Sequence, residues 1–226
     1  SASELTLNDG PIERPPDLWD QGCATDEIRN DFVIPAILDV ASTIGPSSII
    51  DIGCGSGYVA REIVARGAAN EIHWRLLDYA GEMLSFARMR VSSAARTEFF
   101  LHDLRYEPRD LPKSQLGFVA YTFLDFPLDD VIAHNIASLI ATGGTLLIFM
   151  PDVLEDVIEA AAQDPTVLHN YRSGHCSIEK TDKFTFKNVL FEANRVENTI
   201  QRFLRAYFTL TDLKNFRSKR GKLHYM

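Results

Sequence analysis

The sequence contains few cysteines and no long apolar run. Its cysteines are Cys23, Cys54 and Cys176, which lie far apart and form no C-x-x-C pair. This argues against a disulfide framework and against a cysteine-based zinc site. The apolar run at residues 145–150 is much too short to span a bilayer, and the first residues show no charged-then-apolar signal pattern. We therefore expect a cytoplasmic protein without a membrane partner.

Basic residues are in the minority. The chain has 23 lysines and arginines against 31 aspartates and glutamates, which gives a formal net charge of -8 and a pI near 5.2. Nucleic-acid affinity rests largely on lysine and arginine side chains that neutralise phosphates, so this balance disfavours a nucleic-acid partner. The basic stretch 217–222 fits either a phosphate patch or a solvated chain end. The charge therefore favours a small-molecule substrate.

Strand-like and helix-like segments alternate along the middle of the chain, and no linker or internal repeat divides its 226 residues, of which 46% are hydrophobic. The expected strands cover residues 48–51, 72–78, 98–102, 118–123 and 145–150. The expected helices between them cover residues 58–66, 81–90 and 129–141. This alternation is typical of a single α/β domain whose parallel sheet carries helices on both faces.

The flanking segments are less regular. Helical spacing at residues 26–44 predicts a helix with a break at Pro35, and residues 151–163 predict an amphipathic helix. The proline-bearing stretch 104–115 predicts a loop. We expect long β-prone segments at 184–191 and 196–208, a short helix at 211–218 and one short strand at 221–226. The sheet then either takes its last hairpin strand from residues 184–208 or is one strand short.

The segment 48–60 carries the strongest functional signal. An apolar run stops at Gly53, Gly55 and Gly57 and continues as an amphipathic helix, which predicts a strand, a tight turn and a helix start. Glycines permit positive φ and bring a ligand close to the unpaired N–H groups of a helix N-terminus. We therefore expect a nucleotide-like cofactor. Residues 55–60 alone also fit the dinucleotide pattern G-x-G-x-x-G/A.

Three motifs in order narrow the choice of cofactor. Asp51 and the glycines form Asp-Ile-Gly-Cys-Gly-Ser-Gly, followed by Leu-Asp-Tyr-Ala-Gly-Glu-Met-Leu at 77–84 and Phe-Phe-Leu-His-Asp-Leu at 99–104. Together they resemble the motifs of class I S-adenosylmethionine-dependent methyltransferases of small-molecule type. The resemblance implies a doubly wound, mostly parallel sheet of seven or six strands in a three-layer αβα sandwich. It also implies an N-terminal helical cap at 1–45, a cofactor-binding core at 46–150, and an acceptor lid with C-terminal strands at 151–226.

Acidic residues end the first three expected strands, and ligands bind at these ends in open doubly wound sheets. By resemblance, Asp78 binds the ribose, Asp103 or its neighbours bind the adenine amino group, and the glycine loop with Asp51 binds the amino-acid portion of S-adenosylmethionine. Asp78 and Asp103 also fit simple loop caps, and Trp19 fits ordinary packing. The expected cofactor-binding residues are Trp19, Arg29, Asp51, Gly53, Cys54, Gly55, Gly57, Asp78, Tyr79, Met83, His102, Asp103, Leu104 and Tyr121.

Fewer sequence signals point to the residues that would bind the methyl acceptor. Asp125 follows the fourth strand, and His169 and His175 lie in the expected lid, so these three are the candidate catalytic residues. Each also fits an ordinary loop position. The Asn/Asp-Pro-Pro-Tyr/Phe signature of methylation at amide or adenine-type nitrogens is missing at this point. Asp129 and Asp130 are typical of a helix start, so we expect no metal site.

The sequence thus predicts methyl transfer from S-adenosylmethionine to an oxygen or nitrogen of a small molecule. Two alternatives stay open. An NAD(P)-dependent dehydrogenase is favoured by the 55–60 pattern, although Asp51 ahead of the glycines and the lack of a Tyr-x-x-x-Lys pair weaken it. A non-catalytic S-adenosylmethionine-binding or scaffold protein would keep the pocket without the acceptor site.

Overall fold

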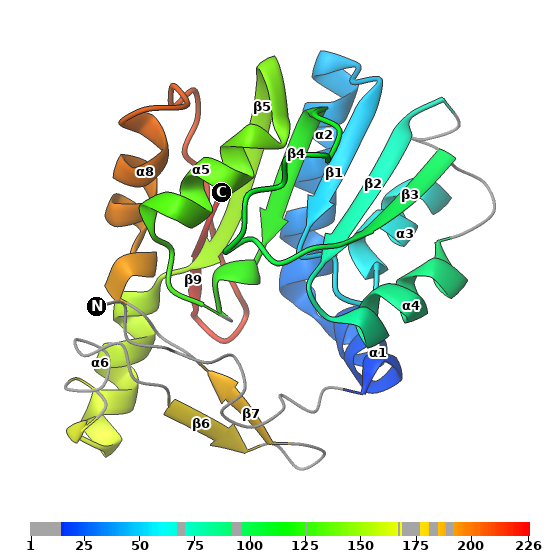
Figure 1. Ribbon diagram of the computed structural model, residues 1–226. Helices are drawn as coiled ribbons and strands as arrows, with labels where there is room; N and C mark the ends of the chain where they lie inside the picture. The colour runs from blue at the N-terminus through cyan, green and yellow to red at the C-terminus, as the bar shows by residue number, and fades with distance from the viewer. Residues whose placement is uncertain are drawn as a thin grey trace.

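A seven-stranded sheet forms the centre of the computed structural model, with strand order β3-β2-β1-β4-β5-β9-β8 (Figure 1). The structure describes residues 15–66, 71–91, 96–124, 126–166, 168, 177–180, 185–188 and 192–226. The strands of the sheet are β1 (Ser48–Ile52), β2 (His73–Asp78), β3 (Arg96–Leu101), β4 (Ser114–Ala120), β5 (Ile140–Pro151), β8 (Asn215–Arg217) and β9 (Leu223–Tyr225). A separate two-stranded sheet pairs β6 (Ser177–Lys180) with β7 (Thr185–Asn188).

The sheet is doubly wound. Strands β1 to β5 run parallel, with Ile50 of β1 opposite Arg75 of β2 on one side and Gly117 of β4 on the other. Strand β9 is antiparallel to both β5 and β8. Because β2 and β4 flank β1 on opposite sides, the direction of winding switches between β1 and β4. Ligands bind at the carboxyl ends of the strands at such a switch point.

Helices cover both faces, as the sequence predicts. They are α1 (Pro16–Thr25), the π-helix η1 (Ile28–Val33), α2 (Ile34–Ile44), α3 (Tyr58–Ala65), α4 (Gly81–Arg90), the 3₁₀ turn η2 (Thr122–Leu124), α5 (Asp130–Ser138), α6 (Val153–Gln163), the 3₁₀ turn η3 (Glu192–Asn194) and α8 (Val196–Leu204). The Asp129 side chain caps α5 by accepting the Ile132 N–H at 2.8 Å. Among the described residues, no helix is long and apolar enough to cross a bilayer.

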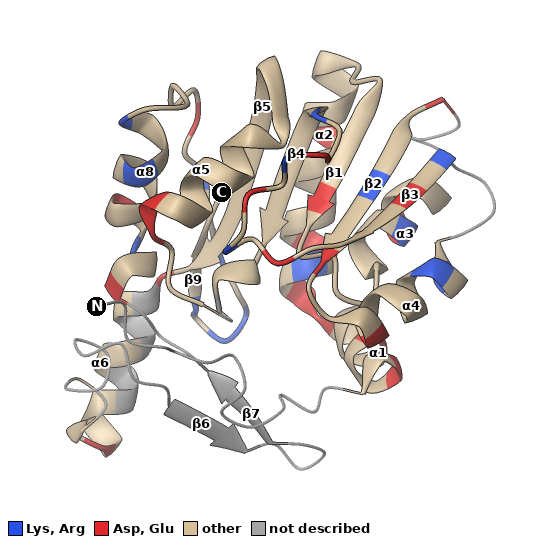
Figure 2. Ribbon diagram, viewed as in Figure 1, with Lys and Arg blue, Asp and Glu red and all other residues tan. Residues whose placement is uncertain are grey.

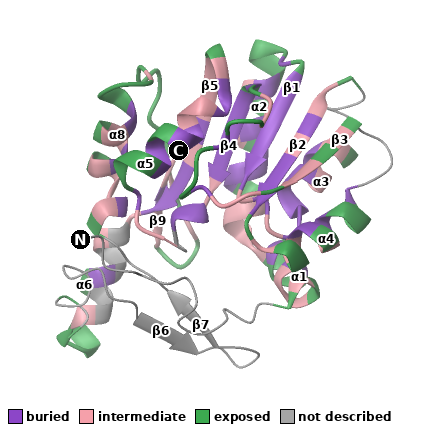
Figure 3. Ribbon diagram, viewed as in Figure 1, coloured by how far each residue is buried: buried purple, intermediate pink, exposed green. Residues whose placement is uncertain are grey.

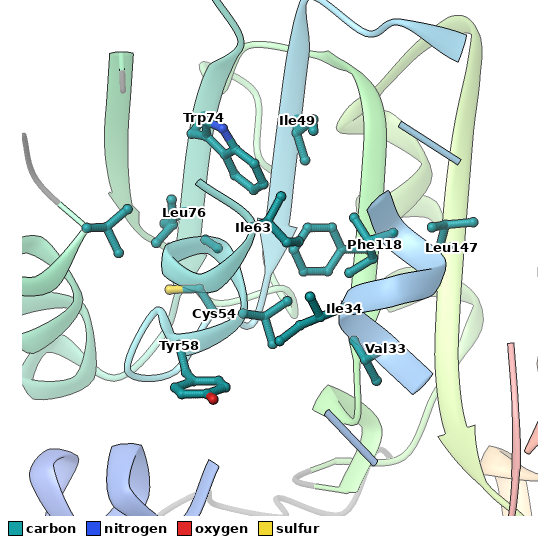
Figure 4. Close-up of a cluster of buried hydrophobic side chains, with 14 of the residues drawn as sticks. Val33, Ile34, Ile49, Cys54, Tyr58, Ile63, Trp74, Leu76, Phe118 and Leu147 are labelled. Carbon is teal, nitrogen blue, oxygen red and sulfur yellow. The ribbon is translucent and has the colours of Figure 1, made fainter. Parts of the chain in front are cut away.

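Alternating side chains along each strand divide the core in two. Ile49, Leu76 and Phe118 point into a cluster with α2, α3 and α4, whereas their neighbours in sequence point into a second cluster with α5 and α8. Figure 3 shows the central strands almost entirely buried, and Figure 4 shows the first cluster, with Trp74, Ile63 and Phe118 between sheet and helices. The three-layer αβα sandwich is therefore confirmed.

The C-terminal part differs from the expectation. Val196–Leu204, expected as part of a β-prone segment, is helix α8, because Thr199 and Phe203 lie one turn apart and are buried on one face. The expected helix at 211–218 is also wrong, since Asn215–Arg217 forms β8 and pairs with β9. The last hairpin therefore comes from the chain after α8. The sheet has seven strands, but neither expected route to its last strand is correct.

Two further boundaries matter for the site. Helix α5 ends at Ser138 and β5 begins at Ile140, whereas the sequence suggested a helix to 141. Strand β4 stops at Ala120 because Tyr121 adopts a positive φ of 62°, so the expected strand at 118–123 turns away from the sheet three residues early. The stretch after β3 is a loop without a helix up to β4, as expected. The turn at Tyr121 leaves space above the carboxyl end of β4.

Candidate functional site

A cavity of about 390 Å³ lies at the carboxyl ends of β1, β2 and β4 and is closed on one side by residues of α1 and η1. Figure 1 shows α1 below the ends of the parallel strands, and Figure 2 shows acidic residues gathered on α1 and at the ends of β1 and β2. The residues that line it are Trp19, Cys23, Asp26, Ile28, Arg29, Asp51, Gly53, Cys54, Gly55, Ser56, Tyr58, Val59, Asp78, Tyr79, Ala80, Glu82, Met83, Ala120, Tyr121, Thr122 and His224.

The glycine loop between β1 and α3 forms the floor of this cavity. The N–H groups of Gly53 and Cys54 donate to the Leu77 carbonyl at 2.7 and 3.0 Å, which fixes the loop against β2. Gly53 has a φ of 77°, and a Cβ there would overlap the Thr122 side chain. Gly57 has a role in packing instead. It does not line the cavity, and a Cβ there would lie 2.9 Å from the Ala87 Cβ, so it permits the close packing of α3 against α4.

The Asp78 carboxylate ends β2 and faces the cavity. Its Oδ2 accepts the Gly55 N–H at 2.7 Å and its Oδ1 accepts the Ala80 N–H at 2.8 Å. Burial raises the pKa of Asp78 above its usual value, and these backbone hydrogen bonds oppose the rise. The carboxylate is therefore held in one orientation, beside the glycine loop.

Asp51 is the most unusual acid of the site. It is 2% exposed, and its Oδ2 has no hydrogen-bond partner among the described residues. Burial, together with the negative charge of Asp78, raises the pKa of Asp51 well above its usual value, while Arg29 acts in the opposite direction. A buried oxygen without a donor is unfavourable, so Asp51 is suited to accept a hydrogen bond from a bound molecule.

Arg29 is a cationic residue in the part of the cavity wall that α1 and η1 form. It forms an ion pair with Asp26, and its guanidinium lies 5.1 Å from the ring centre of Trp19 and 5.7 Å from that of Tyr121. Cation–π contacts of this kind hold a guanidinium in place while its outer N–H groups stay available for an anion.

Asp20 fastens α1 over the glycine loop. The Ser56 hydroxyl donates to its Oδ1 at 3.0 Å, and Arg61 of α3 forms an ion pair with its Oδ2 at 3.0 Å. Asp20 is buried, so both contacts are shielded from water. This position of α1 brings the Trp19 indole close to Gly55, where a Cβ would lie 3.1 Å from its Nε1.

A small side cavity of about 20 Å³ continues beyond the main one, and the two share Gly53, Asp78, Tyr79 and Thr122. Its further lining residues are Leu77, His102, Asp103, Leu104, Arg105, Phe126 and Ile132. Asp103 forms an ion pair with Arg105 at 2.6 Å. Partial burial acts to raise the pKa of Asp103, but the hydrogen bonds from Arg105 outweigh it and the pKa lies below its usual value.

The structure thus brings together most of the residues singled out in the sequence. The main cavity contains Trp19, Arg29, Asp51, Gly53, Cys54, Gly55, Asp78, Tyr79, Met83 and Tyr121. The side cavity adds His102, Asp103 and Leu104, and Gly57 lines neither. The candidate catalytic residues Asp125, His169 and His175 lie outside the described residues. Within the described part of the chain, no group of histidine, cysteine and acidic side chains is arranged to hold a metal ion.

Sequence reasoning missed other residues of the cavity. Asp26 and Cys23 come from the cap, and His224 comes from β9 near the end of the chain. His224 reaches the cavity because β9 pairs with the last residues of β5, with His224 opposite Pro151. No local pattern around His224 signals this position, since the contact depends on how β9 joins the sheet.

Comparisons with known proteins agree with this geometry. Residues 49–144 match the family model described as a methyltransferase domain. A malonyl-[acyl-carrier protein] O-methyltransferase of Halalkalibacterium halodurans is 28% identical over 147 residues, which are 61% of this chain and 52% of that protein. The chain therefore spans about half the length of this curated relative.

Solved structures share the fold. The complex of DhpI with SAH superposes with a TM-score of 0.57 at 18% identity and covers 95% of this chain and 94% of its own. The magnesium protoporphyrin IX methyltransferase of Synechocystis PCC 6803, also with bound SAH, gives a TM-score of 0.60 at 10% identity and covers 88% of this chain and 83% of its own.

Proposed function

We propose that this chain, whose residues 49–144 match the model of a methyltransferase domain, is a class I S-adenosylmethionine-dependent enzyme that transfers a methyl group from S-adenosylmethionine to an oxygen or nitrogen of a small molecule. The observation that carries the proposal is the pair of buried carboxylates, Asp51 and Asp78, which line the cavity from the neighbouring strands β1 and β2. Asp51 in particular has an oxygen that lacks a donor. The family match favours this activity over that of an NAD(P)-dependent dehydrogenase.

The residues present fit this cofactor. Asp78 would accept hydrogen bonds from the ribose hydroxyls, and the unpartnered Oδ2 of Asp51 would accept one from the amino-acid ammonium. Arg29 would pair with the carboxylate of the same moiety. The side cavity beside Asp103 would take the edge of the adenine. Gly53 supports this arrangement because any side chain there would overlap Thr122 and narrow the cavity.

When bound, S-adenosylmethionine supplies a methyl group on a positively charged sulfur, which takes back the bonding electron pair as the acceptor's lone pair attacks the methyl carbon. The chain's own task is to hold the two reactants in line. Rigid walls contribute to this: the loop is bonded to β2, and α1 is fastened by Asp20. Alignment alone lowers such barriers by several kcal/mol.

We propose that the whole chain 1–226 acts as one domain, with a cap at 1–45, a cofactor-binding core at 46–150 and an acceptor lid at 151–226. A small acceptor is favoured by the net charge of -8 and by the modest volume of the cavity, about 390 Å³. The curated relative is, by its name, an O-methyltransferase, which supports oxygen as one acceptor atom. Asp125, His169 and His175 remain our proposed acceptor-side residues.

Two measurements test this function. Titration calorimetry should detect S-adenosylmethionine and S-adenosylhomocysteine at micromolar-scale affinity and no NAD; binding of NAD alone would refute the proposal. The second measurement uses radiolabelled methyl donor with metabolite extracts and, separately, with total RNA, DNA and protein. We expect label in the small-molecule fraction. Label in a macromolecular fraction alone would contradict the acceptor class, and cofactor binding without any transfer would favour the scaffold alternative.

A further inference from the structure

Two ring side chains meet at the wall of the main cavity although they come from distant parts of the chain. Tyr121 follows β4, His224 lies in β9, and the Tyr121 hydroxyl is 2.9 Å from His224 Nδ1. The rings are edge-to-face, with centroids 5.6 Å apart and an interplanar angle of 76°. Both residues line the cavity, and His224 is 9% exposed. The two rings therefore form a hydrogen-bonded pair at the end of β4, in which His224 is buried and Tyr121 is partly buried.

The backbone is bent in order to place this tyrosine. Tyr121 is the only described residue other than glycine with a positive φ, at 62°. Such a conformation is unfavourable for a bulky residue, and residues held in it cluster at functional sites. Its N–H still donates to the Phe149 carbonyl at 3.0 Å, so the bend is fixed by the sheet on one side and by His224 on the other.

Burial, more than the charged neighbours, keeps the proton on the Tyr121 phenol. Burial raises the pKa of Tyr121, while Arg29 over its ring opposes the rise and Asp26 adds to it. The phenol is therefore protonated at neutral pH, and it donates to Nδ1 in the His224 tautomer that carries its ring proton on Nε2. Of the described groups, Arg29 and Asp26 are the charged residues that act on Tyr121.

We propose that Tyr121 and His224 form a proton relay that deprotonates the methyl acceptor. The inference rests on the proposed function. As the acceptor oxygen or nitrogen bonds to the methyl carbon, its proton passes to the Tyr121 oxygen and the phenol proton passes to His224 Nδ1. The carbon–sulfur bond breaks with its electron pair on sulfur, and the positive charge that leaves the sulfonium reappears on the imidazolium, which later releases its proton to water.

The relay also specifies the acceptor class. A carboxylate is already ionised at neutral pH and needs no base, so a relay favours an acceptor that carries a hydroxyl or a neutral amine, which loses its proton as the new bond forms. The relay requires neutral histidine, whose pKa is ordinarily near 6.5, and transfer is expected to fall as the pH drops through that range.

The first test follows His224 by nuclear magnetic resonance of ¹⁵N-labelled histidine in the full chain, in the presence of S-adenosylmethionine or S-adenosylhomocysteine. The positive sulfonium disfavours a nearby imidazolium. The pKa of His224 should therefore be lower in the S-adenosylmethionine complex than in the S-adenosylhomocysteine complex. Equal pKa values in the two complexes would overturn the relay, whereas failure of both molecules to bind would instead overturn the proposed function.

A second His–Tyr pair offers a matched control. His134 Nδ1 lies 3.3 Å from the Tyr207 hydroxyl, the rings are 5.7 Å apart, and neither residue lines the cavity. The ring ¹⁵N chemical shifts of His134 should be the same in both complexes. His134→Gln and Tyr207→Phe should likewise leave methyl transfer unchanged within about twofold.

The second test uses the acceptor found by the radiolabel screen. Tyr121→Phe and His224→Gln should each lower kcat by about 10²- to 10⁴-fold, the usual contribution of general base catalysis, with acceptor KM and S-adenosylhomocysteine affinity within about twofold. The loss of rate at low pH should vanish in His224→Gln. A variant that retains both wild-type kcat and the wild-type pH profile would refute the relay, and so would a loss confined to KM.

Discussion

Replacement of Asp78 by alanine tests the cofactor site most directly. Two ribose hydroxyl hydrogen bonds to a carboxylate, worth roughly 1.5–3 kcal/mol each, would be lost, so affinity should fall by about 10²- to 10⁴-fold. The structure adds a second effect. The N–H groups of Gly55 and Ala80 would lose their acceptor, and stability should fall by about 1–3 kcal/mol. Asp78→Asn keeps one carbonyl acceptor and should lie between the wild type and Asp78→Ala in both properties.

Calorimetric titration with S-adenosylhomocysteine measures the first effect, and urea unfolding measures the second. Asp129→Ala serves as the control, because Asp129 caps α5 away from the cavity and its replacement by alanine should lower stability but not affinity. A folded Asp78→Ala protein that binds S-adenosylhomocysteine within about twofold of the wild type would show that the ribose lies elsewhere.

Three further predictions follow from the geometry of the loop, the buried acid and the cap. Gly53→Ala should abolish S-adenosylhomocysteine binding measured by calorimetry, because the new Cβ would overlap Thr122. Gly45 also has a positive φ but has open space around it. Gly45→Ala should therefore lose about 1 kcal/mol of stability and no affinity. The raised pKa of Asp51 means that its ionisation opposes folding above about pH 4. Asp51→Asn should therefore raise the free energy of unfolding of the ligand-free protein at pH 7 and weaken cofactor binding. A gain in the free energy of urea unfolding that is equally large at pH 3.5 would contradict this prediction. Arg61→Gln should speed amide hydrogen exchange in α1 and lower S-adenosylhomocysteine affinity by roughly tenfold, whereas the exposed Arg109→Gln should do neither.

The parallel part of the fold could be predicted from the sequence because its signals are local. Each strand from β1 to β4 contains a short apolar run, and glycine marks where α3 and α4 begin. The last third lacks such signals. Residues 196–204 are rich in residues that favour strands, yet α8 forms because burying Thr199 and Phe203 on one face outweighs propensity. Strand β8 is only three residues long and exists through its pairing with β9.

The residues of the candidate site likewise include some that a local motif identifies and some that only the tertiary structure brings in. The loop glycines, Asp51 and Asp78 were identifiable because a motif places them at strand ends within one βαβ unit. His224 was not, because it reaches the cavity through pairing with β5 across the sheet. The role of Gly57 was also obscured: its motif position suggests a ligand contact, but the space it leaves is filled by Ala87 and Val91 of the neighbouring helical segment.

The balance of charge around the cavity bears on the choice between a sulfonium cofactor and a dinucleotide. Among the described residues that line it, Asp26, Asp51, Asp78 and Glu82 are acidic, and Arg29 is the only lysine or arginine. Arg29 also pairs with Asp26, so one cation offsets the charge of four acidic lining residues. A pyrophosphate would add further negative charge to this wall, where Arg29 is the one lysine or arginine of the described lining that could offset it. S-adenosylmethionine carries an ammonium and a sulfonium, and both are favoured by Asp51 and Asp78. The glycine pattern alone is compatible with either cofactor, and the acidic residues beside it favour S-adenosylmethionine over a dinucleotide.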